Sequence, residues 1–282
     1  MKKIATALLV FAVLGVGPAL AQSSAPANGT LNIPQLTIPS QPAAPAATKN
    51  ANPPSQVKIP ADPAAAFTAA VAAYEKGNFA DARALFAGAE KKSVSASLEY
   101  NFGNACYQAD DYGAAILHYL RALSLDPRDP DARQNLALAR TAANAPTPDA
   151  TRLDRYSALL GRNSWTWLVT IAGWSALYLA FLPSLFRWRG ALPWLIFSAM
   201  FAITIAGGIG WWGAQQHAHD GVVLQADASL LFSPTANSPA VTTLQNGEVA
   251  QTLEQHGEYY KVHTMSGATG WVAASSYAPV WK

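Results

Sequence analysis

Charged residues are scarce in this chain of 282 residues, where they make up 13% of the total against roughly 25% in an average soluble domain. The 19 Lys and Arg nearly balance the 17 Asp and Glu, which leaves a net charge of +2. Such a balance gives no strong field to hold a phosphate backbone, so we expect no nucleic-acid partner. The single cysteine, Cys106, excludes a disulfide framework within the chain and a cluster of thiolate metal ligands. The low charge favours membrane segments and uncharged linkers.

Motifs for catalysis are also missing from the sequence. It contains no glycine-rich phosphate loop, nucleophile elbow, Cys/His pair or plausible carboxylate pair, so we expect no enzyme and no cofactor. His217 and His219, next to Asp220, could bind Zn²⁺ or Cu²⁺ only with further ligands that their spacing does not supply. We therefore expect hydrated side chains and no metal there. Cys106 is expected to be a small buried hydrophobe, the alternative being a reactive thiol.

The first 63 residues predict export followed by a spacer. Residues 1–21 begin with two lysines, continue with an apolar run and end in Ala-Leu-Ala, which is typical of a signal peptide cleaved before Gln22. The alternative is an uncleaved anchor, which would export the rest of the chain equally well. Residues 22–63 hold nine of the 19 prolines, three charges and no aromatic residue. Such a segment cannot bury enough apolar surface to fold, so we predict a disordered linker.

An internal repeat follows. The segment at residues 74–82 reappears 33 residues later at 107–115, and a period of this length with two helices per unit resembles tetratricopeptide repeats. We predict a helical tetratricopeptide repeat domain over 64–142, with residues 131–140 capping the stack. Small residues are expected where paired helices approach closely: Gly103, Ala115 and Ala122.

The concave face of these repeats is the first candidate binding site. Tetratricopeptide domains that clamp a terminal carboxylate have Lys and Asn where this chain has Phe67 and Val71. The resemblance therefore implies a groove for an apolar or extended peptide segment. The candidate protein-binding residues are Phe67, Val71, Tyr100, Asn104 and Tyr107.

Residues 163–213 predict a membrane hairpin. Their only charges, Arg187 and Arg189, separate two spans, 164–182 and 191–212, of about 28 and 33 Å, close to the roughly 30 Å hydrocarbon core. The arginines place the loop at 183–190 in the cytoplasm by the positive-inside tendency. Residues 143–163 form a linker and juxtamembrane segment, and neither span holds an ionisable residue, which argues against an ion path.

Small residues recur at every fourth position along both spans. In lipid, such residues let helices approach closely and gain van der Waals contact. They either pack the hairpin together or dock a helix of a partner, and the sequence leaves both interpretations open. The residues concerned are Ala172, Ala176 and Ala180 in the first span, and Ser198, Ala202, Ala206 and Gly210 in the second.

The remaining residues, 221–282, are rich in short β-type runs. Asn246-Gly247 predicts a tight type I′ hairpin between residues 241–244 and 249–253, and further turns are expected at 256–257 and 266–267. We predict about five strands in a small closed barrel.

The segments 229–234, 241–247, 257–262 and 267–272 resemble a bacterial SH3 domain in the expected order. Where that family has Gly-Trp-Tyr-Lys-Val, this chain has Glu258 inserted and Tyr259 in place of the tryptophan. Tyr259, Trp271 and Tyr277 are candidates for an exposed ligand-binding surface, and the alternative is that Trp271 and Tyr260 belong to the core.

The fold class is thus multi-domain: a helical repeat domain, a two-helix transmembrane hairpin and an all-β SH3-like barrel. This order of modules resembles the bacterial aerotolerance protein family BatE. The resemblance implies a non-enzymatic inner-membrane scaffold in envelope stress or oxygen tolerance, with both soluble domains periplasmic. It also implies Bat-family partners that carry von Willebrand factor A-like domains. The alternative is a peptidoglycan-binding sensor that acts through the SH3-like domain, and a membrane enzyme would need a catalytic constellation that the sequence lacks.

Overall fold

The computed structural model describes residues 57–148, 151–186, 190–216 and 219–281, which fall within one compact unit, Gln35–Lys282. Several predictions concern residues outside this description: the signal peptide, nearly all of the disordered linker, the loop arginines Arg187 and Arg189, and His217.

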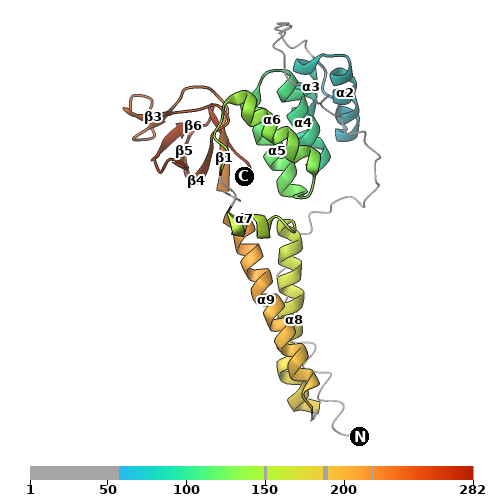
Figure 1. Cartoon of the computed structure of the whole chain (residues 1–282). Coiled ribbons are helices and arrows are strands. Elements are labelled where there is room, and N and C mark those ends of the chain that lie inside the picture. Colours follow the sequence, from blue (N-terminus) through green and yellow to red (C-terminus); the bar gives the residue numbers. More distant parts are fainter. Residues whose placement is uncertain (1–56, 149–150, 187–189, 217–218, 282) are drawn as a thin grey trace. The chain divides into compact units, whose positions relative to one another are not determined.

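The tetratricopeptide region is a succession of antiparallel helices (Figure 1). All of its helices except α3 (Phe79–Glu90) start after a residue whose side chain accepts a hydrogen bond from an amide of the first turn. The Asp62 carboxylate accepts a hydrogen bond from the Ala65 amide at 2.9 Å, and the Ser95 hydroxyl accepts one from the Leu98 amide at 3.2 Å, which satisfies amides that would otherwise lack partners. The helices are α2 (Pro63–Glu75), α3 (Phe79–Glu90), α4 (Ala96–Gln108), α5 (Tyr112–Leu125) and α6 (Pro130–Ala143).

The close approach of α4 and α5 depends on small residues. A Cβ atom added to Gly103 would lie 2.6 Å from the ring of Tyr119, and Ala115 and Ala122 are fully buried. Tyr119 is itself fully buried and fills the space that these residues leave. The sequence-based expectation of small residues at this contact is therefore confirmed.

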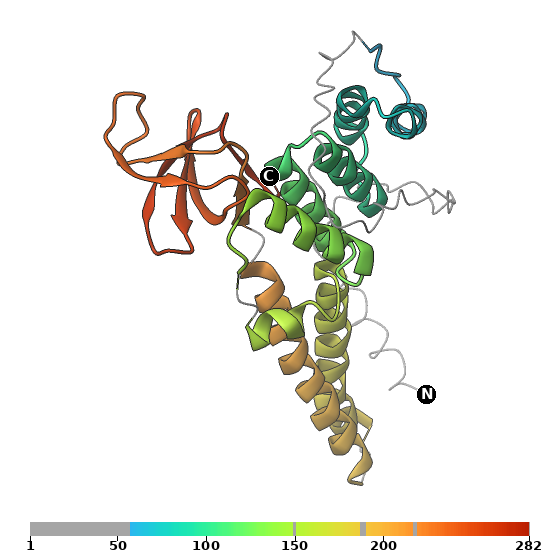
Figure 2. The ribbon, with the colours of Figure 1, turned by 45° about the horizontal axis from the view of Figure 1, so that its top comes forward.

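Two long apolar helices, α8 (Arg162–Phe186) and α9 (Leu192–Gln216), lie side by side in both views (Figure 1, Figure 2). The short helix α7 (Arg152–Ser157) precedes them and packs against α9. Among the described residues, one segment, Trp194–Gln216, is long and apolar enough to cross a membrane, with a mean hydropathy of 1.7. Helix α8 does not meet that criterion over its described part, so its membrane crossing remains a prediction.

The C-terminal region is an antiparallel sheet of seven strands in the order β3-β2-β6-β5-β4-β1-β7. Apolar side chains that alternate along the strands fill its core, among them Val223, Leu230, Val262 and Val272. The sheet exceeds the expected five strands because short segments at both ends of the domain pair with each other. The strands are β1 (Asp220–Val223), β2 (Ala228–Leu231), β3 (Ala240–Leu244), β4 (Val249–His256), β5 (Tyr259–Thr264), β6 (Thr269–Ala273) and β7 (Tyr277–Pro279).

The predicted hairpin at Asn246-Gly247 is wrong. Strands β3 and β4 flank this turn, but β3 pairs with β2 and β4 pairs with β5 and β1. A type I′ turn needs positive φ at both central residues, whereas here Gly247 has φ of 80° and Asn246 is not among the positive-φ residues. The Gly247 amide instead donates to the Val223 carbonyl at 2.8 Å. The turns at 256–257 and 266–267 do join paired strands, β4 to β5 and β5 to β6.

Candidate interaction surfaces

The candidate groove residues of the repeat domain fall into two groups. Tyr100 and Asn104 are buried, because they belong to a hydrogen-bonded network between α4, α5 and α6. Asn104 accepts hydrogen bonds from the Tyr119 hydroxyl at 2.7 Å and from the Asn135 amide at 3.1 Å. These two residues therefore hold the helices together from within, whereas the other three candidates, Phe67, Val71 and Tyr107, are partly exposed.

The three aromatic candidates of the SH3-like domain also lie in different places. Tyr277 is 1% exposed, and its hydroxyl donates to the Ala250 carbonyl at 2.9 Å. Tyr260 is likewise in the core, whereas Trp271 is partly exposed. Neighbouring residues of a strand face opposite sides of the sheet, so Trp271 and Tyr259 lie on the outer face, where the Lys261 ammonium stands 5.8 Å from the centre of the Trp271 ring.

A shallow hollow of about 300 Å³ adjoins this outer face. Tyr259 lines it, together with the polar side chains Gln225, Asp227, Ser229 and Ser276. An aromatic ring beside carboxylate, amide and hydroxyl groups is a surface suited to a polar, hydrogen-bonding ligand.

The small residues of α8 and α9 have unequal surroundings. Ala172 and Ala176 on α8 are each 5% exposed, so they lie within the helix pair. On α9, Gly210 is buried against Trp165, whose ring would meet an added Cβ atom at 2.6 Å. The remaining members of the pattern are partly or fully exposed: Ala180, Ser198, Ala202 and Ala206.

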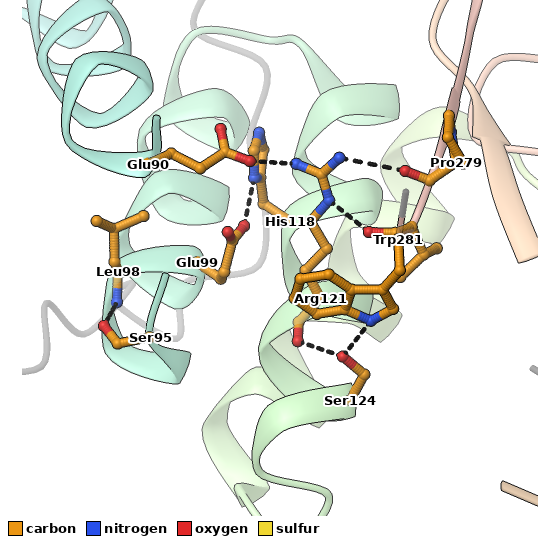
Figure 3. Close-up of polar contacts among 10 residues, drawn as sticks. Glu90, Ser95, Leu98, Glu99, His118, Arg121, Ser124, Pro279 and Trp281 are labelled. Atoms are coloured by element: carbon orange, nitrogen blue, oxygen red, sulfur yellow. Dashed lines mark hydrogen bonds and ion pairs between the residues drawn. The ribbon is translucent and has the colours of Figure 1, made fainter. Parts of the chain in front are cut away.

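The C-terminal segment of the chain contacts helix α5, as Figure 3 shows. The Arg121 guanidinium donates to the carbonyls of Val280 at 2.8 Å and Pro279 at 3.2 Å, and the Trp281 indole donates to the Ser124 hydroxyl at 2.7 Å. Val280 is 4% exposed and belongs to the same apolar cluster as the repeat helices. This contact joins residues about 160 positions apart, on either side of α8 and α9.

Beside this contact lies a buried pair of ionisable side chains, Glu99 of α4 and His118 of α5. Glu99 is 0% and His118 5% exposed, and the His118 Nδ1 lies 2.7 Å from a Glu99 carboxylate oxygen. The His118 ring also stacks on Phe102, with 3.7 Å between the ring centres. Glu90 of α3 is near, and its carboxylate accepts a hydrogen bond from Arg121 at 2.5 Å.

Burial governs the protonation of this pair. Desolvation raises the pKa of the Glu99 carboxyl to about 7, with the Arg121 charge acting in the opposite direction. Desolvation, followed by the Arg121 charge, lowers the pKa of His118 to about 3. Between about pH 3 and 7 the imidazole is therefore uncharged, and the pair holds one proton on the carboxyl side.

The cluster could not be recognised from the sequence because its members come from three helices, and each stands alone in its own segment. One signal was available: Glu99 lies between Leu98 and Tyr100, and His118 between Leu117 and Tyr119. A polar residue inside an apolar stretch of a helix indicates a buried polar group that needs a partner.

Other predicted site residues can also be placed. Cys106 is fully buried, and desolvation raises the pKa of its thiol to about 12, so the expectation of a buried hydrophobe is confirmed. His219 is exposed and Asp220 opens strand β1.

Comparison with known families supports the two soluble domains. Residues 103–141 match a TPR repeat, and residues 227–278 match a bacterial SH3 domain. A search of curated proteins gives no match, and neither does a search of solved structures. The chain thus combines two kinds of domain that in general mediate protein–protein interaction and, for bacterial SH3 domains, peptidoglycan binding.

Proposed function

We propose that this protein is a non-enzymatic scaffold of the bacterial inner membrane. In this proposal it presents its repeat domain and its SH3-like domain together on the periplasmic side. The observation that carries the proposal is the contact between α5 and Pro279–Trp281. These residues flank α8 and α9 in the sequence, and they can meet only if both lie on the same side of any membrane that the helices enter.

In this proposal the contact requires an even number of crossings. Helix α9 is apolar enough to span, so α8 would have to span as well. Its 25 residues correspond to about 37 Å, more than the hydrocarbon thickness of about 30 Å. Large apolar side chains on α8 are open to the surroundings, including Ile171, which is 61% exposed, and Phe181, which is 67% exposed, and lipid would cover them. The periplasmic side is proposed because of the predicted signal peptide and the two loop arginines.

Impermeant labelling tests this topology. Ser93 and Ser275 are both exposed, one in the repeat domain and one in the SH3-like domain. In a Cys106→Ala background, Ser93→Cys and Ser275→Cys should each react with a membrane-impermeant maleimide in intact cells whose outer membrane has been permeabilised. Reaction of one site alone before lysis would refute a two-pass hairpin, and reaction of neither before lysis would refute the periplasmic assignment.

Protein partners are the expected ligands of the scaffold. The supporting features are the partly exposed groove residues Phe67, Val71 and Tyr107, and the exposed small residues of α9, which a helix of a partner could contact. Following the resemblance to the BatE family, we propose membrane proteins with von Willebrand factor A-like domains as these partners, acting in envelope stress or oxygen tolerance. Crosslinking in cells followed by mass spectrometry should recover such proteins, and recovery of no reproducible membrane protein would count against the scaffold.

Peptidoglycan binding is the second candidate function, favoured by the hollow beside Tyr259 and by Trp271, which is partly exposed on the same outer face. Detergent-solubilised full-length protein should sediment with isolated sacculi. Tyr259→Ala should reduce the retained fraction several-fold, whereas Leu253→Ala, which removes a side chain that is 52% exposed and does not line the hollow, should leave it unchanged. Equal retention of all three proteins would rule out this surface.

A further inference from the structure

Three potential metal ligands converge inside the repeat domain. Glu90, Glu99 and His118 come from three successive helices, and their ligand atoms all lie within 4.8 Å of one another. Figure 3 shows the three side chains pointing toward one another. Two carboxylates and one imidazole, brought from separate helices into a space of this size, match the donor types and the number of protein ligands of open zinc sites.

An independent observation concerns the second oxygen of Glu99. This atom, Oε1, is buried, and among the described residues it has no hydrogen-bond partner. A buried carboxylate oxygen without a partner costs on the order of 1–3 kcal/mol or more, so proteins rarely leave one unsatisfied. It lies in the cluster that holds His118 and Glu90, and a cation bound there would supply the missing partner.

We propose that Glu90, Glu99 and His118 form a binding site for one divalent transition-metal ion, with Zn²⁺ as the best fit. An imidazole nitrogen favours Zn²⁺ over Mg²⁺ and Ca²⁺, which prefer oxygen ligands alone. Three protein ligands leave the fourth position of a tetrahedral site for water. Binding of the ion would release the proton that Glu99 and His118 share, as metal binding requires deprotonated ligands.

Arg121 belongs to the surroundings of this site and does not prevent it. Its guanidinium bonds one oxygen of Glu90 at 2.5 Å, which leaves the other carboxylate oxygen for an ion and fixes the orientation of the ligand. Once the Glu99 proton has left, two carboxylates and one guanidinium give the cluster a net charge of −1, which favours a divalent cation there. Through Arg121 the site also adjoins the carbonyls of Pro279 and Val280.

Metal titration of the full-length protein tests the proposal. The protein, purified in detergent without a polyhistidine tag, is stripped with EDTA and dialysed. Isothermal titration should then show one Zn²⁺ per chain and no binding of Mg²⁺, and Co²⁺ should produce visible absorption bands at the same stoichiometry. Glu99→Gln and His118→Gln should each weaken Zn²⁺ binding at least tenfold, and Glu90→Gln should weaken it too.

The matched control is His219→Gln. His219 is exposed and outside the cluster, so this change should leave the stoichiometry and affinity as they are. Circular dichroism checks the fold of each variant, and Glu90→Gln, at a partly exposed position, provides the test if the two buried changes prevent folding. The proposal is overturned if the folded wild-type protein binds neither Zn²⁺ nor Co²⁺. It is also overturned if binding survives all three cluster variants, or if it disappears in His219→Gln.

Discussion

At the scale of single residues, the contact between Gly103 and Tyr119 sets how closely α4 and α5 approach. Because an added Cβ atom would lie 2.6 Å from a fully buried ring, we expect Gly103→Ala to reduce the free energy of unfolding by about 1–3 kcal/mol, as measured by urea denaturation. The control is Gly88→Ala in α3, because the three atoms nearest to its new methyl group all belong to the side chain of Ile59, which is 46% exposed and can move aside. A smaller loss for Gly103→Ala than for Gly88→Ala would contradict this account of the packing.

The pair Glu99–His118 predicts an unusual dependence of stability on pH in the metal-free protein. In the unfolded state the pair holds one proton between pH 4.5 and pH 6.5, the ordinary pKa values of the two groups. In the folded state it holds one proton over a wider range, from about pH 3 to about pH 7. Stability should therefore be independent of this pair from pH 4.5 to 6.5. Stability should fall as the pH drops from 4.5 toward 3, because the unfolded pair then binds one more proton than the folded pair. It should also fall slightly as the pH rises from 6.5 to 7, because the folded pair then holds one more proton than the unfolded pair.

Glu99→Gln separates the two groups. The variant retains only His118, whose lowered pKa means that the unfolded state binds more protons at every pH from 6.5 down to about 3. The variant should thus lose stability relative to wild type by about 1.4 kcal/mol per pH unit between pH 6.5 and 4.5, the range in which the wild-type pair makes stability independent of pH. Denaturation at pH 6.5, 5.5 and 4.5 in the presence of EDTA measures the difference. Parallel curves for the two proteins would show that the pair does not share its proton as described.

At the scale of elements, helix α5 packs against α4 within the repeat domain and also contacts the C-terminal segment at residues 279–281. Arg121→Ala removes the donors to Pro279, Val280 and Glu90. Hydrogen exchange should become at least several-fold faster in residues 277–281, and the free energy of unfolding should fall by about 1–3 kcal/mol. Arg133→Ala on α6 is the control, because that side chain is exposed and, within the described part of the chain, bonds only the Pro127 carbonyl. Unchanged exchange in Arg121→Ala would mean that other contacts hold the segment.

The elements also show which features could be predicted from the sequence. Helices of the repeat domain were predictable because small and aromatic residues recur at a fixed period, and the SH3-like domain because its segments follow a family order. The hairpin at Asn246-Gly247 was not, since the local turn signal cannot report that β4 pairs with β1 and β5. Tyr100 and Asn104 were placed in the groove from their positions along a helix, but the partner that buries them, Asn135, lies on α6. The Glu90, Glu99 and His118 cluster needed three helices to be packed before it could be recognised.

At the scale of the whole molecule, two domains that α8 and α9 separate in the sequence contact each other. Gly247 reinforces the contact made by Arg121 and Trp281, because an added Cβ atom there would lie 2.4 Å from the Ile116 side chain. The SH3-like domain therefore packs on α5 of the repeat domain. A protein bound to the repeat domain would be held at a fixed position relative to a protein bound to the SH3-like domain.

Crosslinking within native membranes tests this claim most directly. The Ser124 hydroxyl and the Trp281 indole are 2.7 Å apart, so a Cys106→Ala chain carrying Ser124→Cys and Trp281→Cys should form an intramolecular link with a short bismaleimide. A protease cut engineered between the domains should then leave the two halves joined on a denaturing gel. Either single-cysteine variant should give no such link. The contact, and the placement of both domains on one side of the membrane, would be contradicted if the halves separate although a monofunctional maleimide labels both cysteines.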